Sequence, residues 1–373
     1  MMSMKTNSGV IPFLTAFWVL SLSGCRTMDK GPLMREREKD AGTGLAKVVM
    51  GYYPSWKRAE FDHTKIRYEN LTHIMHAFTK PDAEGNLVVD PGYVYPELVA
   101  MAHTRGVKIL TSMGGWGNCD GFAPTAADPV KRERFIEQIV GFCKTNGYDG
   151  ADIDWEFVSN PEEQRNFVVL VKELSARLKA QNPPLLLTMA VPSGDYYGQW
   201  INYEAVASDF DYISFMTYDY HGDWSDHAGH NAPLYSCEGD ACGSMNDTYL
   251  YAVLRKVPND KLLLGIPFYG RSFNTGGLYQ RFTQTEGYGY GEIMDLEKAG
   301  WRYNWDFCSQ APYLRSPDGG TIITFDDMRS VYRKCRYVLD NGAAGFIIWE
   351  ISEDSVDGAP QLLNIIGTAF RSK

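Results

Sequence analysis

The sequence predicts an α/β fold: a (β/α)8 barrel whose eight parallel strands alternate with helices, with a small α+β insertion between the seventh and eighth strands. From about residue 46 onward, short apolar runs alternate with amphipathic helical stretches. The runs are apolar on nearly every residue, which is typical of parallel strands covered on both faces. The chain has 373 residues, and a barrel of this kind routinely uses about 250 or more as one domain.

The expected strands are, in chain order, residues 48–53, 71–78, 107–112, 148–157, 185–191, 212–219, 262–269 and 344–350. Capping residues mark helices between them. We expect one helix over 96–103 that stops at Gly106, one from Asp128 to Gly147, one that begins at Asn160, and one that is capped by Asp326 and closed by Gly342. Residues 272–322 break the alternation and are rich in Gly, Tyr and Trp, so we expect an inserted lobe there, within a barrel over 46–373.

The N-terminus reads as a targeting segment rather than as part of the fold. Lys5 precedes an apolar run from Val10 to Leu22 that is too short to span a bilayer. The run ends Leu-Ser-Gly-Cys, which resembles a bacterial lipobox and implies cleavage before Cys25 and lipid attachment to its thiol. We therefore expect a signal peptide over residues 1–24, a tether over 25–45 and a membrane anchor at Cys25. An ordinary secretory signal with an incidental cysteine is the alternative, and both imply export.

Composition restricts the partners. The net charge is −10 and the sequence pI is about 5.3, with no basic run, which argues against a nucleic-acid partner. A neutral polymer is compatible with this balance. Aromatic residues make up 13% of the chain, which suits stacking on sugar rings but is also how large cores are filled. We expect a monomer that needs no cofactor.

The cysteines suggest different roles. Cys143 and Cys335 fall on apolar helical stripes and are expected to be core thiols. Cys237 and Cys242 flank a short segment, which suggests a small loop-closing disulfide, although connectivity cannot be read from sequence. No Cys/His spacing resembles a zinc site.

The fourth strand carries an unusual concentration of acids. With a period of two, its acidic residues share one face and its apolar residues share the other. Side chains on one strand face lie roughly 6–7 Å apart, so three ionised carboxylates would repel one another and at least one should hold a proton near neutrality. A protonated carboxylic acid beside ionised ones is what acid-catalysed cleavage of a glycosidic bond requires. The acidic face is Asp152, Asp154 and Glu156, and the apolar face is Ile153, Trp155 and Phe157.

Two other interpretations compete. The acids, with Glu163, partly match a calcium loop, but that loop needs Gly where Phe157 stands. A solvated acidic edge strand is disfavoured by the apolar alternates, which need cover, and by Gly150, which allows close backbone approach.

The stretch from Asp149 to Glu156 reads Asp-Gly-Ala-Asp-Ile-Asp-Trp-Glu and resembles the Asp-Gly-x-Asp-x-Asp-x-Glu signature of glycoside hydrolase family 18. Three further segments resemble family motifs. The resemblance implies a (β/α)8 TIM barrel with the insertion forming one wall of the substrate groove, although this insertion looks short for a deep tunnel. The segments are 112–116 (Ser-Met-Gly-Gly-Trp), 216–219 (Met-Thr-Tyr-Asp) and 265–273, followed by Trp349.

The resemblance also implies roles for individual residues. Glu156 would be the general acid and base. Asp154 would orient the substrate acetamido N–H, and Tyr218 would donate to the acetamido oxygen that attacks the anomeric carbon. Asp152 would share a proton with Asp154, helped by Tyr52 and Ser112. The remaining expected substrate contacts are Trp116, Met216, Asp219, Tyr269, Arg271 and Trp349.

Plainer interpretations exist for several of these residues. Trp116 can be a core residue, and Arg271 can simply pair with a nearby carboxylate. His221, His227 and His230 lie amid Asp223 and Asp226, but on an irregular Gly-containing loop without fixed spacing, so we predict no metal there. One departure stands out: many family members have Tyr-Pro after the catalytic Glu, whereas this chain has Phe-Val.

The leading functional hypothesis is retaining, substrate-assisted hydrolysis of β-1,4-linked N-acetylglucosamine polymers, that is, chitin and chitooligosaccharides. Within the same mechanism, the substrate is alternatively an N-glycan core or peptidoglycan. From another class come a catalytically silent chitin-binding lectin, which usually lacks the acid or its Asp partner, and a surface adhesin.

Overall fold

The computed structural model describes residues 43–238, 240 and 242–371. The expected signal peptide, the lipid attachment at Cys25 and nearly all of the expected tether lie outside these residues. Within the described part of the chain, no helix combines the length and the apolar character needed to cross a membrane.

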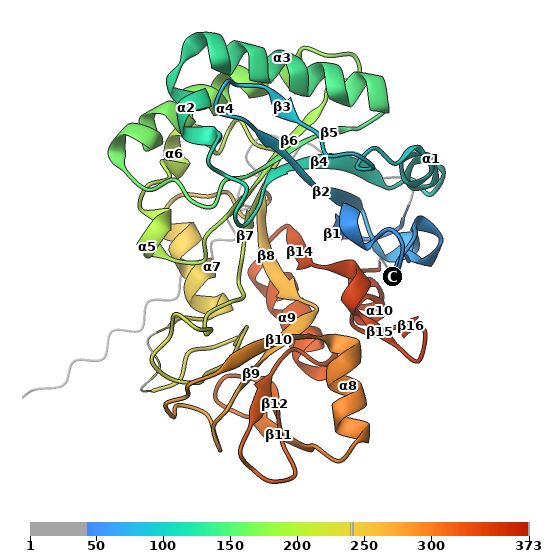
Figure 1. The fold of residues 1–373 in the computed structure, drawn as a ribbon, viewed down its shortest axis with the longest axis vertical. Helices are drawn as coiled ribbons and strands as arrows, with labels where there is room; N and C mark the ends of the chain where they lie inside the picture. The colour runs from blue at the N-terminus through green and yellow to red at the C-terminus, as the bar shows by residue number, and fades with distance from the viewer. Residues whose placement is uncertain (1–42, 239, 241, 372–373) are drawn as a thin grey trace, which may run out of the picture. The chain divides into compact units, whose positions relative to one another are not determined.

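Eight parallel strands form a closed barrel, as the sequence predicts (Figure 1). Neighbours pair in chain order around the barrel, and pairing of the first strand with both the second and the last closes it. The short antiparallel strand β3, Leu87–Val88, extends β2 at one edge. The barrel strands are β1 Val48–Pro54, β2 His73–Pro81, β4 Lys108–Gly114, β5 Gly150–Asp154, β6 Leu186–Val191, β7 Tyr212–Phe215, β8 Leu262–Pro267 and β14 Gly345–Trp349.

Helices surround the barrel and bury apolar stripes against it (Figure 1). The side chain of Asp128 caps α3, and Gly147 ends it in the left-handed conformation, as predicted. Asn160 caps α4 in the same way. The helices are α1 Pro96–Thr104, α2 Phe122–Ala127, α3 Pro129–Asn146, α4 Pro161–Lys179, α5 Asp195–Gly198, α6 Tyr203–Val206, α7 Met245–Leu254, α8 Tyr290–Lys298, α9 Met328–Asn341 and α10 Leu362–Phe370.

The predicted cap of α9 is wrong by one residue. The side chain that accepts from the helix N-terminus belongs to Asp327, not to Asp326. Asp326 is instead fully buried in an ion pair with Lys334 one to two turns along the helix. A buried ammonium needs a charged partner, so the side chain of Asp326 pairs with Lys334, and the neighbouring Asp327 caps the helix instead.

The insertion between the seventh and eighth barrel strands is an α+β lobe, as expected. Its five antiparallel strands have the order β10-β9-β13-β12-β11, and α8 lies beside them (Figure 1). A small hairpin follows the barrel, formed by β15 Ser355–Val356 and β16 Ala359–Pro360. The lobe strands are β9 Tyr269–Phe273, β10 Thr285–Gly289, β11 Arg302–Asp306, β12 Ala311–Arg315 and β13 Ile322–Thr324.

The cysteines only partly follow expectation. Cys143 and Cys335 are buried free thiols, as predicted. The suggested disulfide between Cys237 and Cys242 is wrong, because Cys237 pairs with Cys308 across 71 residues. This bond joins the loop after β7 to the turn between β11 and β12, and Cys242 stays free.

Candidate active site

The acidic segment lies where β5 meets the C-terminal end of the barrel, where enzymes of this architecture place their chemistry. Strand pairing ends at Asp154, so Trp155 and Glu156 already belong to the following loop rather than to the strand as expected. The alternation of faces nevertheless holds for the strand itself: Asp152 and Asp154 are buried inside the barrel, and Ile153 joins the outer apolar core. The acids therefore do not lie on a solvated edge strand.

Asp152 is fully buried and accepts three hydroxyl hydrogen bonds. Tyr52 and Ser112 donate to Oδ2 at 3.0 and 2.8 Å, and Thr188 donates to Oδ1 at 2.6 Å. Burial raises the pKa of Asp152, and the three hydroxyls oppose that rise. The donors come from β1, β4 and β6, so the closed barrel itself holds this carboxyl group in place.

Asp154 lies one layer nearer the mouth of the barrel and is buried with fewer hydrogen bonds than Asp152. Its Oδ1 has no hydrogen-bond partner among the described residues. Burial raises the pKa of Asp154 well above its ordinary value, and the negative fields of Glu156 and Asp152 raise it further. Asp152 and Asp154 are buried side by side, so the pair retains one proton. Because Asp152 accepts three hydrogen bonds and Asp154 has an unpartnered oxygen, Asp154 holds that proton more strongly.

Glu156 sits at the mouth beside the loop that follows β4. Burial raises the pKa of Glu156 to about 7, and the negative field of Asp219 adds to the rise, while the backbone N–H of Trp116 opposes it. Its own backbone N–H donates to Sγ of Cys119 at 3.1 Å. A carboxyl group with a pKa near neutrality can both give and take a proton at physiological pH.

Paired glycines allow the β4 loop to approach this segment. Gly114 and Gly115 both have positive φ, and a Cβ on Gly114 would lie 2.2 Å from the carbonyl oxygen of Asp154. The N–H of Gly115 donates to that same carbonyl at 2.9 Å. Larger residues would push the loop, and Trp116 with it, away from the acids.

Tyr218 follows β7 and is buried at the mouth near all of these acids. Burial raises the pKa of Tyr218 well above its ordinary value, with added negative fields from Asp154 and Glu156, so the hydroxyl remains a proton donor. A Cβ on Gly265 would lie 2.7 Å from the Tyr218 ring, so the glycine on β8 provides space for it. The preceding residue, Thr217, is held in place because its hydroxyl accepts from the N–H of Gly265 and donates to the carbonyl of Gly265, each at 2.7 Å.

Asp219 is held by two residues of the inserted lobe. Tyr269 donates to Oδ1 of Asp219 at 2.7 Å, and Arg271 donates through Nε at 2.9 Å and Nη2 at 2.8 Å. The guanidinium also lies 4.9 Å from the ring of Trp224. Arg271 thus does pair with a nearby carboxylate, and in doing so it links the loop after β7 to β9.

Aromatic rings line the site beside the acids. The ring of Trp349 lies 5.3 Å from that of Tyr52 and stacks on Phe78 at 5.7 Å. Phe78 in turn lies 6.1 Å from Trp56, which is 59% exposed. Met216 packs partly buried against the same cluster. The set forms a continuous apolar surface from the barrel interior to solvent.

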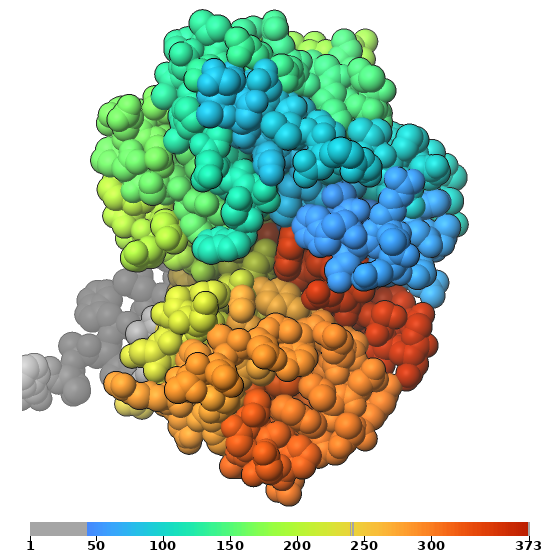
Figure 2. All heavy atoms as spheres, viewed as in Figure 1, coloured from blue at the N-terminus to red at the C-terminus, as the bar shows by residue number. Residues whose placement is uncertain are grey.

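Trp116 is not a core residue, because 79% of its surface is exposed. An indole ring left in water at the mouth of a barrel is available to a ligand. Figure 2 shows the surface hollowed in a furrow between the blue-green half of the barrel and the orange inserted lobe, with red C-terminal residues at its floor.

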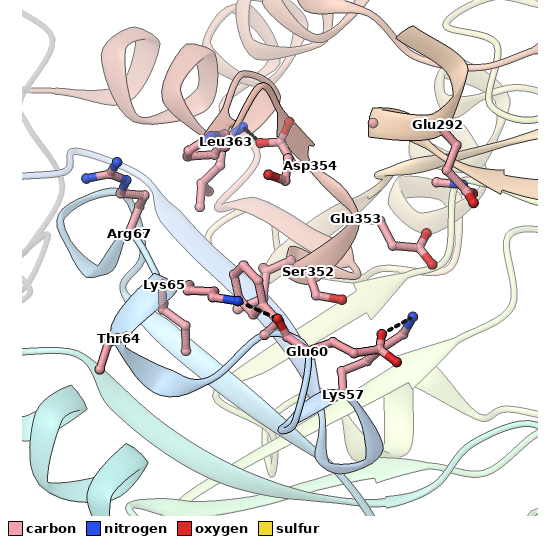
Figure 3. A pocket seen from close by; sticks show the side chains of 18 of the residues that line it. Lys57, Glu60, Thr64, Lys65, Arg67, Glu292, Ser352, Glu353, Asp354 and Leu363 are labelled. Atoms are coloured by element: carbon pink, nitrogen blue, oxygen red, sulfur yellow. Dashed lines mark hydrogen bonds and ion pairs between the residues drawn. The ribbon is translucent and has the colours of Figure 1, made fainter. Parts of the chain in front are cut away.

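A second hollow of about 680 Å³ lies beside the barrel strands' ends and contains none of the residues above. Its lining is charged, with Lys57, Glu60, Glu292 and Glu353 around it (Figure 3). Burial raises the pKa of Glu353 to about 7. Phe61, Thr64, Ser352 and Ser355 also line it, but none of the acids described above does, so this hollow is separate from the acidic site.

Sequence reasoning missed several residues of the site. Thr188 and Cys119 contact it through hydrogen bonds, and Trp56 and Phe78 extend its aromatic surface. Thr188 had a detectable signal, because it is the polar residue in an otherwise apolar strand next to β5. Trp56 lies in a single 3-10 turn and Cys119 on an irregular segment, and no periodic pattern indicates where their side chains point.

Comparison with known proteins places this architecture among glycosidases. The family model "Glycosyl hydrolases family 18" matches residues 48–354. Chitinase 1 of Aphanocladium album is 28% identical over 365 residues, which cover 87% of this chain and 85% of that protein.

Solved structures are similar as well. The Group IV chitinase of Ostrinia furnacalis in complex with allosamidin has a TM-score of 0.81 at 27% identity, over 86% of this chain and 98% of that one. A mutant family 18 chitinase of Cycas revoluta in complex with (GlcNAc)4 has a TM-score of 0.78 at 26% identity, over 86% and 99%. With the family model matching most of its length, this chain belongs to the glycosyl hydrolases of family 18.

Proposed function

We propose that this protein hydrolyses β-1,4 links between N-acetylglucosamine units, as in chitin and chitooligosaccharides, with retention of configuration. The single observation that carries the proposal is the buried acid series next to Tyr218, with Glu156 at a pKa of about 7. The chitinase relatives and the neighbours solved with allosamidin or (GlcNAc)4 support the substrate class.

The mechanism assigns one task to each acid. Glu156 protonates the leaving oxygen and later removes a proton from the incoming water. The acetamido oxygen of the substrate attacks the anomeric carbon, so no second enzyme carboxylate acts as nucleophile. Tyr218 donates to that oxygen, and Asp154 accepts from the acetamido N–H through its unpartnered Oδ1.

Positive charge then develops on the oxazolinium ring beside Asp154. That charge favours the ionised form of Asp154, so its proton moves to Asp152, whose hydroxyl partners can reorient. The full set of acids thus acts as one coupled system. Asp219, Tyr269 and Arg271 bind the sugar at the cleavage point, and Trp349 and Trp116 support sugar rings.

The lectin alternative is disfavoured because both Glu156 and Asp154 are in place. We further propose that the protein is exported, acts as a monomer and is held to a membrane by a lipid at Cys25. Cys25 follows the lipobox-like residues 22–24, which supports this part of the proposal.

The test is release of soluble oligosaccharides from colloidal chitin, with a high-mannose glycopeptide and cell-wall sacculi assayed in parallel. We expect turnover of chitin well above that of the other two substrates and almost none with Glu156→Gln. Preferential cleavage of the glycopeptide or the sacculi would reassign the substrate, and binding without product would favour a lectin.

A further inference from the structure

A cluster of potential metal ligands lies in the loop region between β7 and α7, outside the proposed catalytic residues. One donor atom from each of its residues lies within 4.8 Å of every other. Two of the residues come from the first part of the loop and two from a segment further along the same loop. The cluster consists of His221, His227, Asp240 and Cys242.

Three donor atoms of the cluster converge closely. Nε2 of His221 lies 3.2 Å from Nε2 of His227 and 3.3 Å from Oδ1 of Asp240. Nε2 of His227 lies 3.7 Å from the same Oδ1. In a tetrahedral zinc site with bonds of about 2.0–2.1 Å, neighbouring N and O ligands lie roughly 3.3–3.4 Å apart. The observed spacing is therefore close to that of a preformed site.

The hydrogen bonds at the other ring nitrogens determine the tautomers. Nδ1 of His221 lies 2.9 Å from the carbonyl oxygen of His230, which can only accept, so Nδ1 carries the proton. Nδ1 of His227 likewise faces a carboxylate oxygen of Asp226 at 2.6 Å. In the neutral rings, both Nε2 lone pairs therefore point toward one another and toward Asp240. A positive charge among them, either a metal ion or a proton on one ring, offsets this arrangement of lone pairs.

The surroundings are those of a metal site's outer shell. Imidazole ligands typically donate their second N–H to a carboxylate or a backbone carbonyl, and this chain provides one of each. His221 and Asp240 have side chains that are 0% and 2% exposed, so their positions are fixed by packing. A Cβ on Gly229 would lie 2.3 Å from the His221 ring, so a glycine keeps this space open.

We propose a structural zinc site whose four ligands are His221, His227, Asp240 and Cys242. Imidazole and thiolate together favour Zn²⁺ over Ca²⁺ or Mg²⁺, which prefer oxygen ligands. Four protein donors complete a tetrahedron and leave no open position, so the metal has a structural role. Binding closes the remaining gap to Cys242, whose thiol releases its proton to solvent as the zinc–sulfur bond forms.

The site differs from the sequence expectation of no metal on this loop. That expectation considered the histidines with Asp223 and Asp226, and it did not include the segment that carries Asp240 and Cys242. The metal would tie this segment to His221, two residues beyond Asp219. It would thereby hold the loop that reaches the proposed substrate groove.

The experiment measures zinc per chain by elemental analysis after stripping with a chelator, reloading with zinc chloride and gel filtration. We expect one zinc ion per chain in the wild-type protein and loss of retained zinc in His227→Gln and Cys242→Ser, two partly exposed positions. Asp226→Ala, which removes the outer hydrogen bond, should weaken zinc affinity by about 10–100-fold. His103→Gln is the matched control, because His103 forms a surface pair with Asp149 at 2.9 Å.

Cobalt provides a second readout that does not depend on activity. Cobalt-loaded wild-type protein should show a thiolate-to-cobalt charge-transfer band that is absent in Cys242→Ser, with unchanged far-ultraviolet circular dichroism. Retention of no zinc by the wild-type protein, or equal zinc content in the ligand variants and the control, would overturn the proposal.

Discussion

The hydroxyl of Thr188 donates a 2.6 Å hydrogen bond to Oδ1 of Asp152 and thereby joins two neighbouring barrel strands at the base of the acidic site. With Tyr52 and Ser112 on the other oxygen, all three donors stabilise the ionised form of Asp152. Asp154 has no such donor at Oδ1, and the negative fields of Glu156 and Asp152 raise its pKa further. The two aspartates therefore differ in proton affinity even though both are buried.

Replacement of Glu156 by Gln should reduce kcat by about 10²–10⁴-fold, because general acid catalysis typically contributes that much. Steady-state hydrolysis of a chitooligosaccharide checks this, with circular dichroism to show that the fold is intact. Glu162→Gln serves as the matched control at the exposed start of α4, and it should retain full activity. Substantial turnover by Glu156→Gln would remove Glu156 from the role of acid.

Replacement of Tyr218 by Phe should lower kcat by about 10²–10³-fold, the usual cost of removing one donor to a developing charge. The ring packs against Gly265, so the variant keeps its shape and loses only the hydroxyl. Comparison of kcat and KM distinguishes a catalytic donor from a binding contact. An effect confined to KM would contradict the assigned role.

The pH dependence follows from Glu156. Because its pKa is raised to about 7 and the acid must be protonated, kcat/KM should fall with rising pH, with a midpoint near 7. On the acid side, activity should fall as the aspartate pair takes up a second proton, above the ordinary range of aspartate because burial raises the pKa of both Asp152 and Asp154. A pH–rate profile of the free enzyme measures both limbs. A basic limb near the ordinary glutamate value would contradict the buried environment.

The free energy of unfolding should also depend on pH through Glu156. An exposed glutamate in the unfolded chain ionises near 4.5, whereas folded Glu156 keeps its proton to about 7. Its contribution to stability is therefore full below about pH 4.5 and is lost as pH rises through 7. The melting temperature of Glu156→Gln should exceed that of the wild-type protein by more at about pH 8 than at about pH 4. A difference that does not vary with pH would speak against the raised pKa.

Replacement of Trp116 by Ala should weaken binding to polymeric chitin by about tenfold while leaving the melting temperature nearly unchanged, because the ring is 79% exposed. Tyr332, which is 53% exposed on the outer helix α9, provides the control. Binding isotherms on insoluble chitin compare the two variants. Equal affinities for Trp116→Ala and Tyr332→Ala would exclude Trp116 as a substrate platform.

Much of this architecture was predictable because periodic apolar runs determine strands and helices locally. The predicted ends of α3 at Asp128 and Gly147, and the predicted start of α4 at Asn160, were correct for the same reason. Asp326 was misjudged because its role depends on the buried ammonium of Lys334, which no local pattern reveals.

The site was predictable where its residues lie on one strand or directly after one. The contacts from Thr188 and Cys119, the Cys237–Cys308 disulfide and the cluster around His221 were not, because each joins segments that are distant in sequence. Such pairings depend on how loops meet in space, and the sequence of one segment carries no record of its partner.

The central claim is that the substrate's own N-acetyl group acts as the nucleophile beside Asp154 and Tyr218. The most direct measurement is the identity of the new reducing ends formed from a chitosan that contains acetylated and free amino sugars at random in roughly equal amounts. We predict that nearly every new reducing end is N-acetylglucosamine. Glucosamine at those ends in proportion to its abundance in the polymer would contradict the mechanism.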